Sequence, residues 1–262
     1  MNLNSYFLAL SALTLQTTAV QAQGYKFITT LQTTPLEIAQ KDTCKYRCPE
    51  IHAYFVETDY PALDKAINSD TLNFINSYNQ DSIEDIKVEI DAVKVDDFLS
   101  KIYQSLKKQE ADFDVPGINM YSTILVQPAF TGTFNDLFMY ESSQYSFILG
   151  AAHPYTGIKQ FVYDTKNNKL LTAKDLVKEG MFEKFQKLAH AEFIKQSTAN
   201  KVDKNIAKEA DFFVSDNFTF NTDGIIFTYN PYEILGYALG KQTVYIGYEE
   251  LKDLFKPEYL PK

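Results

Sequence analysis

The sequence predicts an α+β protein in which helices pack on one face of a mostly antiparallel sheet, organised as two small α+β modules in one chain. Apolar residues recur at helical spacing through much of the first half, up to a break at Pro116–Gly117. After this break, short β-branched and aromatic runs alternate with turn residues. The clearest is a hairpin around Asn221–Gly224, a kind of turn that joins antiparallel strands.

Residues 1–22 are predicted to be a signal peptide. They carry no charge and include the apolar run Tyr6–Leu15, and small residues at Val20 and Ala22 place cleavage before Gln23. The competing interpretation is a buried N-terminal helix, since the usual Lys or Arg near the start is missing. The run is too short to cross a bilayer and no later stretch approaches that length, so we expect a periplasmic or secreted protein without a transmembrane span.

The chain has two cysteines, Cys44 and Cys48, separated by three residues. In an oxidising compartment such a pair is most simply a local disulfide. A redox pair usually has two intervening residues, and a metal site needs more ligands than the nearby His52 supplies. We therefore expect a structural disulfide and no metal.

Residues 23–130 form the predicted N-terminal module. Strand-like pieces occur at Tyr25–Ile28 and Ala53–Val56, and Asp59 with Pro61 marks the start of a helix. Apolar residues follow that start at helical spacing, namely Leu63, Ala66, Ile67, Phe74, Ile75 and Tyr78.

A second helical stretch runs from about Ile83 to Val93 and restarts near Asp96. The restarted helix has one apolar face, formed by Phe98, Leu99, Ile102, Tyr103 and Leu106. Lys107–Glu110 is predicted to be its solvated end, and Met120–Val126 to be a strand.

Residues 131–262 form the predicted C-terminal module. Strands are expected at Leu137–Tyr140, Tyr145–Leu149 and Lys159–Tyr163, and a polar turn follows at Asp164–Lys169. Thr172 is then a candidate cap for a helix that extends to about Gln196. One side of that helix carries apolar residues, namely Phe182, Phe185, Leu188, Ala189 and Phe193.

The remainder of this module is mostly β-structure. Gln196–Glu209 is polar and predicted to be a loop or a frayed helix. The hairpin strands Phe218–Phe220 and Ile225–Tyr229 follow, then a strand at Thr243–Ile246 and a short helix over Tyr248–Phe255.

Composition and motifs exclude several functional classes. The 34 acidic residues exceed the 25 basic ones and give a formal charge of −9, so the chain lacks the basic face that nucleic-acid binding needs. Phosphate-binding glycine motifs, nucleophile elbows and metalloprotease motifs are absent from the sequence. The histidines His52, His153 and His190 are dispersed. We therefore predict no catalytic residue, no metal and no cofactor.

Two segments are candidate binding loops. The first runs from Gly150 to Gly157, with small residues around His153 and Tyr155. Its structural interpretation is a tight connection between strands, which small residues permit. The second runs from Pro231 to Gly240 and carries Tyr232, Glu233 and Tyr237. Tyrosine suits an interface, but it also suits a loop packed back on its own sheet.

These two segments, and the residues between them, resemble a known family. It includes the extracellular domain of the lysozyme-sensing anti-sigma factor RsiV and the non-catalytic N-terminal region of the peptidoglycan deacetylase PdaC. The matching segments are Ala152–Pro154, Gln160–Asp164, Lys169–Leu176, Asp223–Phe227, Pro231–Ile234, Gly240, Val244–Ile246 and Glu250–Leu251. The Pro-Tyr-Glu-Ile segment is the most specific of these.

The resemblance covers Tyr145–Phe255 well and Cys44–Gln127 loosely. It implies the fold and a binding role at the cell envelope, with lysozyme or a similar basic protein as the ligand. One departure is Ala151–Ala152, where the family has paired glycines. Lysozyme-contacting residues do not match position by position and are not carried over. Two alternatives stay open, a module that binds peptidoglycan or another glycan, and a hydrolase with an unrecognised site. The charge of −9 favours a basic protein.

Overall fold

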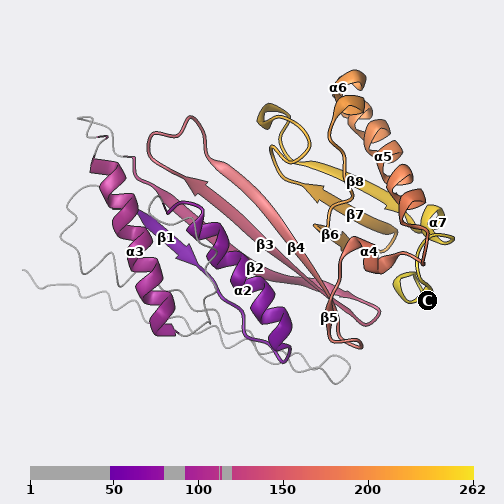
Figure 1. The fold of residues 1–262 in the computed structure, drawn as a ribbon, viewed down its shortest axis with the longest axis horizontal. Helices are drawn as coiled ribbons and strands as arrows, with labels where there is room; N and C mark the ends of the chain where they lie inside the picture. The colour runs from indigo at the N-terminus through magenta and orange to yellow at the C-terminus, as the bar shows by residue number, and fades with distance from the viewer. Residues whose placement is uncertain (1–47, 80–91, 112, 114–119) are drawn as a thin grey trace, which may run out of the picture.

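The structure, a computed structural model, describes residues 48–79, 92–111, 113 and 120–262. The predicted signal peptide, the strand at Tyr25–Ile28 and the helical residues Ile83–Ile90 lie outside this range. Cys48 is half-buried just before the first strand, but Cys44 lies outside the described residues, so the disulfide stays a prediction. The described residues form two sheets with their helices, side by side in Figure 1.

The larger sheet has five strands in sequence order. They are β1 (Glu50–Ala53), β2 (Thr123–Phe134), β3 (Leu137–Phe147), β4 (Tyr155–Asp164) and β5 (Lys169–Leu170). Strand β1 pairs with β2 in parallel, and every other neighbouring pair is antiparallel. The predicted α+β class with a mostly antiparallel sheet is therefore confirmed.

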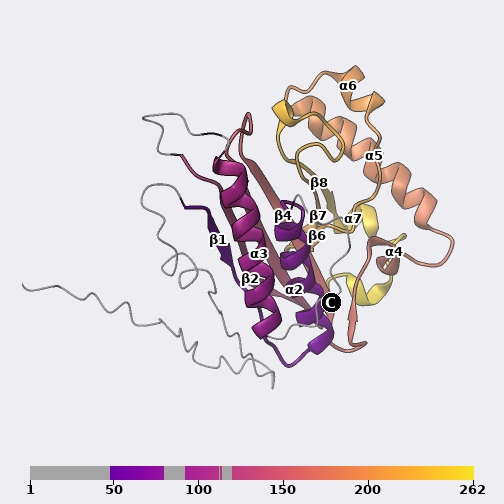
Figure 2. The ribbon, with the colours of Figure 1, turned by 60° about the vertical axis from the view of Figure 1, so that its left-hand side comes forward.

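Two helices cover one face of this sheet, α2 (Pro61–Asn76) and α3 (Ala92–Ala111) (Figures 1 and 2). Proline occupies the first turn of α2, where no helical hydrogen bond from its nitrogen is needed. The predicted apolar stripes are buried, and they include Leu63, Ile67, Ile75, Phe98, Leu99, Ile102, Tyr103 and Leu106. Helical periodicity thus predicted the packing face of both helices.

The end of α3 differs from the prediction. Glu110, expected in a solvated end, is only 7% exposed. Its Oε1 accepts a hydrogen bond from the backbone N–H of Ser122, which directly precedes β2. Oε1 thus pairs with a main-chain donor that the sheet does not satisfy, whereas Oε2 is buried without a hydrogen-bond partner.

The smaller sheet is antiparallel, with the order β6 (Phe218–Phe220), β7 (Gly224–Tyr229) and β8 (Gln242–Gly247). The predicted hairpin is confirmed as β6 and β7. Asn221 Oδ1 closes its turn by accepting from the N–H groups of Asp223 and Gly224. The helical segments of this half of the chain are α4 (Ala173–Leu176), α5 (Phe182–Ala199), α6 (Lys204–Glu209), α7 (Tyr248–Leu251), η1 (Tyr237–Leu239) and η2 (Pro257–Tyr259).

The helix predicted from about Lys174 to Gln196 is two helices, α4 and α5. Between them, Val177 forms an isolated β-bridge with Phe255, and the Lys178 N–H donates to the Leu254 carbonyl at 2.9 Å. Gly180 then adopts a φ of +73°, which a helix does not allow. Phe185 and Phe193 are fully buried as predicted, and Phe182 packs at the edge of the core.

Both sheets contribute to one hydrophobic core. Leu137, Met139 and Val162 of β3 and β4 pack with the residues of α5 and β7. On the opposite face of the same strands, Phe138 and Tyr140 pack beneath α2. This end of the large sheet is therefore buried on both faces. The predicted module boundary at residues 130 and 131 falls inside β2.

Candidate functional site

The two candidate loops contact each other, although about 80 residues of sequence separate them. The loop with His153 connects β3 to β4, and the loop with Tyr232 and Tyr237 connects β7 to β8. The Tyr237 hydroxyl donates a hydrogen bond to the Pro154 carbonyl at 2.7 Å. The Tyr232 hydroxyl lies 3.3 Å from His153 Nε2. The fold thus assembles one surface from segments of both sheets.

Three rings form the aromatic cluster, which comprises His153, Tyr232 and Tyr237. The His153 and Tyr237 rings stack with centroids 3.5 Å apart and planes 17° apart. The ring centroids of Tyr232 and Tyr237 are 5.4 Å apart, and the two ring planes make an angle of 30°. The planes of the three rings are therefore inclined to one another by 17° to 30°. Because His153 is half-buried against Tyr237, the open ring face in this cluster belongs mainly to Tyr232.

Tyr232 is unusual in two respects. Its side chain is 63% exposed, and its φ is +75°, in the left-handed region that large side chains rarely adopt. Hydrogen bonds hold this turn in place. The Tyr232 N–H donates to the Leu235 carbonyl, and the Glu233 N–H donates to the Asn230 carbonyl, both at 3.1 Å. The loop therefore maintains an exposed ring in a conformation that costs energy locally.

Glu233 fixes the base of the loop. Its Oε2 accepts from the Asn230 N–H at 2.9 Å. The Asn230 side chain reaches across to β4, where its Oδ1 accepts from the Ile158 N–H at 2.8 Å and its Nδ2 donates to the Ile158 carbonyl at 3.1 Å. Glu233 is exposed, yet it acts on the loop through Asn230. The orientation of the loop is thereby tied to the large sheet.

Tyr155, the fifth candidate residue, packs against α2 rather than joining the stacked rings. Its ring centroid lies 5.9 Å from that of Phe74. Burial raises the pKa of the Tyr155 hydroxyl, and the nearby carboxylate of Glu233 raises it further. Tyr155 therefore stays neutral and supports the start of β4 beside the loops.

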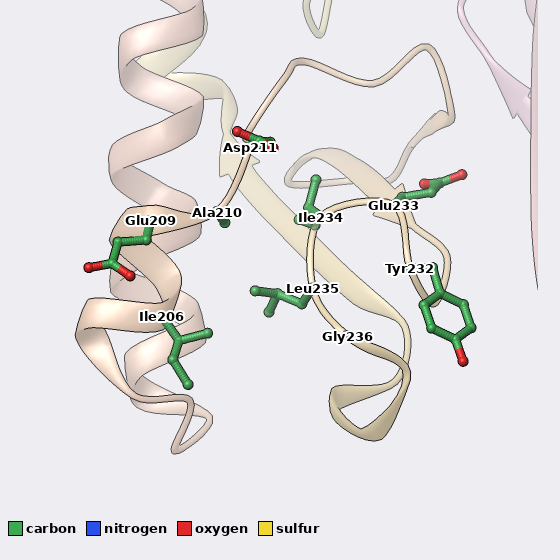
Figure 3. Close-up of a pocket in the computed structure, with 9 residues that line it drawn as sticks. All are labelled: Ile206, Glu209, Ala210, Asp211, Tyr232, Glu233, Ile234, Leu235 and Gly236. Carbon is green, nitrogen blue, oxygen red and sulfur yellow. The ribbon is translucent and has the colours of Figure 1, made fainter.

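A groove adjoins the aromatic cluster (Figure 3). It has a volume of about 420 Å³ and lies between the α6 segment and the loop after β7. Its lining residues are Ile206, Glu209, Ala210, Asp211, Tyr232, Glu233, Ile234, Leu235 and Gly236. Tyr232 and Glu233 belong to both the groove and the loop surface. The candidate site is therefore continuous.

The groove combines apolar walls with negative charge. Ile234 and Leu235 are largely buried, whereas Ile206 on the opposite side is exposed. The lining residues include the acidic Glu209, Asp211 and Glu233 and neither Lys nor Arg. The Glu209 and Glu233 side chains point away from the space between α6 and the loop (Figure 3). Such a surface attracts cations that also carry apolar atoms.

Sequence reasoning missed the α6 side of this groove. The segment that ends at Glu209 was predicted to be a polar loop or a frayed helix, but it contains the end of α5 and the short helix α6. Asp203 caps α6 by accepting from the N–H of Asn205 at 2.7 Å. The isolated apolar residue Ile206 in a polar stretch was the available signal. Its position opposite Leu235 depends on long-range packing.

Within the described ranges, no three His, Cys, Asp or Glu side chains gather in a way that could hold a metal ion. The helices of the described ranges include none that is both long and apolar enough to span a bilayer.

Comparisons with known proteins agree with this architecture. Residues 174–249 match the model of a family described as a protein of unknown function, DUF3298. The sequence of the chain matches no curated protein. Two crystal structures of DUF3298 proteins are similar in fold, one from Pseudomonas aeruginosa PAO1 and one from Bacteroides fragilis.

The Pseudomonas protein is 19% identical with a TM-score of 0.57, and the alignment covers 90% of this chain and 96% of that one. The Bacteroides protein is 19% identical with a TM-score of 0.58, and the alignment covers 89% of this chain and 94% of that one. Identities this low show the fold alone. The resemblance to the RsiV and PdaC domains is consistent with these matches and stays a prediction. Residues 174–249 thus match the DUF3298 family model, and the fold of the chain is similar to that of two DUF3298 proteins.

Proposed function

We propose that this chain is an exported binding protein of the cell envelope, without enzymatic activity, whose ligand is a basic protein. The observation that carries the proposal is the exposed Tyr232 beside a groove whose lining residues include Glu209, Asp211 and Glu233. Tyrosine is enriched at protein interfaces because its ring is apolar and its hydroxyl is polar. The charge pattern of the groove selects a positively charged partner.

Two further observations support the nature of the partner. The formal charge of −9 attracts a basic protein over long range and raises its rate of association. The sequence resemblance to the RsiV domain makes lysozyme the leading candidate. Export rests on the uncharged apolar segment at residues 1–22 and its small residues near Ala22.

A glycan is the second candidate ligand, favoured by the geometry of the aromatic cluster. The rings of His153, Tyr232 and Tyr237 present an apolar surface beside the carboxylate of Glu233, which can accept hydrogen bonds. An uncharged glycan would bind with little dependence on salt, whereas a basic protein would bind more slowly as salt increases.

The test uses the chain from Gln23 onward, captured on a surface. Lysozyme, an equally basic unrelated protein and soluble peptidoglycan fragments are applied at low and high salt. We expect lysozyme to bind with an association rate that falls with salt, and the unrelated protein to bind far less. Equal binding of both proteins would indicate nonspecific charge attraction. Binding of the fragments alone would replace the protein ligand with a glycan.

A further inference from the structure

We infer that His153 sets the hydrogen-bonding role of the exposed Tyr232 hydroxyl, which accepts from the ligand when the imidazole is neutral and donates when the imidazole is protonated. Binding of a basic partner at the aromatic cluster is then stronger at neutral pH than in acid. This inference rests on the proposed function and adds the regulation of the same surface. Three hydrogen bonds that run through the cluster support it.

The first two hydrogen bonds determine which nitrogen of His153 carries the proton. Its Nδ1 lies 3.1 Å from the Pro154 carbonyl oxygen, which can only accept. The same oxygen accepts from the Tyr237 hydroxyl at 2.7 Å and so uses both of its lone pairs. Neutral His153 therefore carries its proton on Nδ1 and presents a bare Nε2. Stacking on Tyr237, with ring centroids 3.5 Å apart, holds the imidazole in this orientation.

The third hydrogen bond joins the bare Nε2 of His153 to the Tyr232 hydroxyl, 3.3 Å away. Because a bare imidazole nitrogen can only accept, Tyr232 donates its single hydroxyl proton to it. The Tyr232 oxygen then has only lone pairs left for a ligand. Tyr232 is 63% exposed, so a ligand can reach this oxygen. With His153 neutral, the Tyr232 hydroxyl is therefore an acceptor toward a bound partner.

This hydrogen-bonding role matches a basic protein. Tyr232 and Glu233 point to the same side of their loop, away from α6 (Figure 3). An ionised carboxylate also accepts hydrogen bonds and has no proton to donate. The side chains of lysine and arginine carry several N–H donors and no acceptor. A basic partner therefore complements this side of the loop in both charge and hydrogen bonding.

Protonation of His153 reverses this role. The protonated Nε2 becomes a donor, so the Tyr232 oxygen accepts from it and the Tyr232 proton turns outward. A positive charge also enters the surface and repels a basic partner. The other titratable side chains of the two loops and of the start of β4 are Tyr155, Tyr232, Glu233, Tyr237 and Lys241. Histidine is the side-chain type that ordinarily changes charge between about pH 5 and 8, so His153 is the group that responds in this range.

The first experiment needs no ligand. Nitrogen NMR of the chain from Gln23 onward identifies the tautomer of His153, and the Cζ resonance of Tyr232 reports the hydrogen bonding of its hydroxyl. We expect neutral His153 to carry its proton on Nδ1, and the Tyr232 Cζ resonance to shift as His153 titrates. His153→Gln should abolish this shift. A neutral His153 with its proton on Nε2, or a Tyr232 Cζ resonance that does not change as His153 titrates, would overturn the inference.

The second experiment measures the affinity of lysozyme for the captured chain at about pH 8 and about pH 5.5, at one salt concentration. Between these two conditions the affinity of the parent should fall about 2- to 10-fold more than that of His153→Gln, the usual effect of one hydrogen bond. The control is His52→Gln, which removes another half-buried histidine from outside the aromatic cluster and should respond to pH as the parent does. Equal pH responses of the two variants would show that only net charge matters, which contradicts the inference.

A substitution of Tyr232 tests the hydroxyl itself. Tyr232→Phe keeps the ring and removes the group that His153 controls. It should weaken lysozyme binding at about pH 8 by about 2- to 10-fold and reduce the response to pH. A variant that binds and responds to pH as the parent does would overturn the role of the hydroxyl.

The two experiments distinguish this inference from the proposed function. If lysozyme binds and its response to pH does not depend on His153, the proposed function stands and this inference falls. If lysozyme binds at neither pH while the NMR spectra show His153 and Tyr232 changing together, lysozyme is not the partner and the switch of the Tyr232 hydroxyl stands.

Discussion

The side chain of Asn217 hydrogen-bonds to the main chain of Gln160, with its Oδ1 accepting from the backbone N–H at 2.7 Å. Its Nδ2 also donates to the Ile158 carbonyl at 2.8 Å. Asn217 thus pairs with the edge of β4 as a neighbouring strand would, beyond the point where β5 ends. Together with Asn230, it joins the two sheets and satisfies an otherwise open edge.

Asn217→Ala should therefore lower the free energy of unfolding by about 1–3 kcal/mol, because it removes a side chain that is only 3% exposed and leaves the Gln160 N–H of β4 without its acceptor. Chemical denaturation measures this loss. Asn205→Ala, on the exposed surface of α6, is the control and should stay within about 0.5 kcal/mol of the parent protein. Equal stability of both variants would show that water replaces the Asn217 contacts without cost.

The Phe185 side chain is central to the core of the smaller sheet. It is fully buried, with ring centroids 5.7 Å from Phe227 and 5.2 Å from Phe255. Phe185→Ala should cost about 3–5 kcal/mol, the usual effect of a cavity of this size. Phe182→Ala, on the same helix at the edge of the core, should cost clearly less. Denaturation midpoints that rank the two variants in the opposite order would contradict this packing.

Local sequence patterns predicted these elements well because their signals are contained in single segments. The apolar stripes of α2 and α3, the Asn221–Gly224 turn and the buried Phe185 and Phe193 all follow from residue spacing. The break between α4 and α5 was missed because its cause is distant. Val177 pairs with Phe255, and nothing near Val177 in the sequence indicates that contact.

The candidate site depends even more on contacts between segments that are distant in the sequence, and local patterns predicted only part of it. The sequence marked His153, Tyr232 and Tyr237 through unusual loop composition, and the structure brings these three together. The sequence could not reveal that Ile206 lies across a groove from Leu235, since that arrangement depends on the packing of α6 beside the loop. The sequence also did not reveal that the Glu233 carboxylate, a predicted ligand-binding group, accepts a hydrogen bond from Asn230 within the loop.

Asp70 provides a prediction about pH. Burial raises the pKa of its carboxyl group, and this outweighs the opposing effects of Lys159 and of the hydrogen bond from Gln144 at 2.9 Å. A raised pKa in the folded state means that stability is lost as the pH rises through that pKa. Asp70→Asn retains the hydrogen bond and stays neutral. Its stability advantage over the parent should be absent at low pH and should grow as the pH rises.

Asp175 should behave in the opposite way. Burial alone would raise its pKa, but hydrogen bonds from Lys169 and Thr172 outweigh burial and lower it. Stability from such a group is present above the ordinary pKa of an aspartate and is lost as the pH falls. Asp175→Asn should therefore be less stable than the parent at neutral pH, and the difference should shrink in acid. Denaturation at several pH values measures the free energy of unfolding of each variant relative to the parent. If this difference changes with pH in the same direction for Asp70→Asn and Asp175→Asn, the opposite pKa shifts of the two carboxyl groups are contradicted.

Glu233 gives the last prediction, because two roles for it lead to different results. If it acts mainly by accepting from the Asn230 N–H, Glu233→Ala should release the loop, and the amides of Asn230 and Tyr232 should exchange hydrogen faster. Glu233→Gln keeps an acceptor oxygen and should restore much of that protection. Global stability should change by only about 1 kcal/mol, since the carboxylate is exposed. If Glu233→Gln instead protects the loop fully but loses affinity for the basic partner, the charge itself contacts the ligand. The measurement thus decides whether Glu233 positions Tyr232 or contributes directly to the negative surface of the groove.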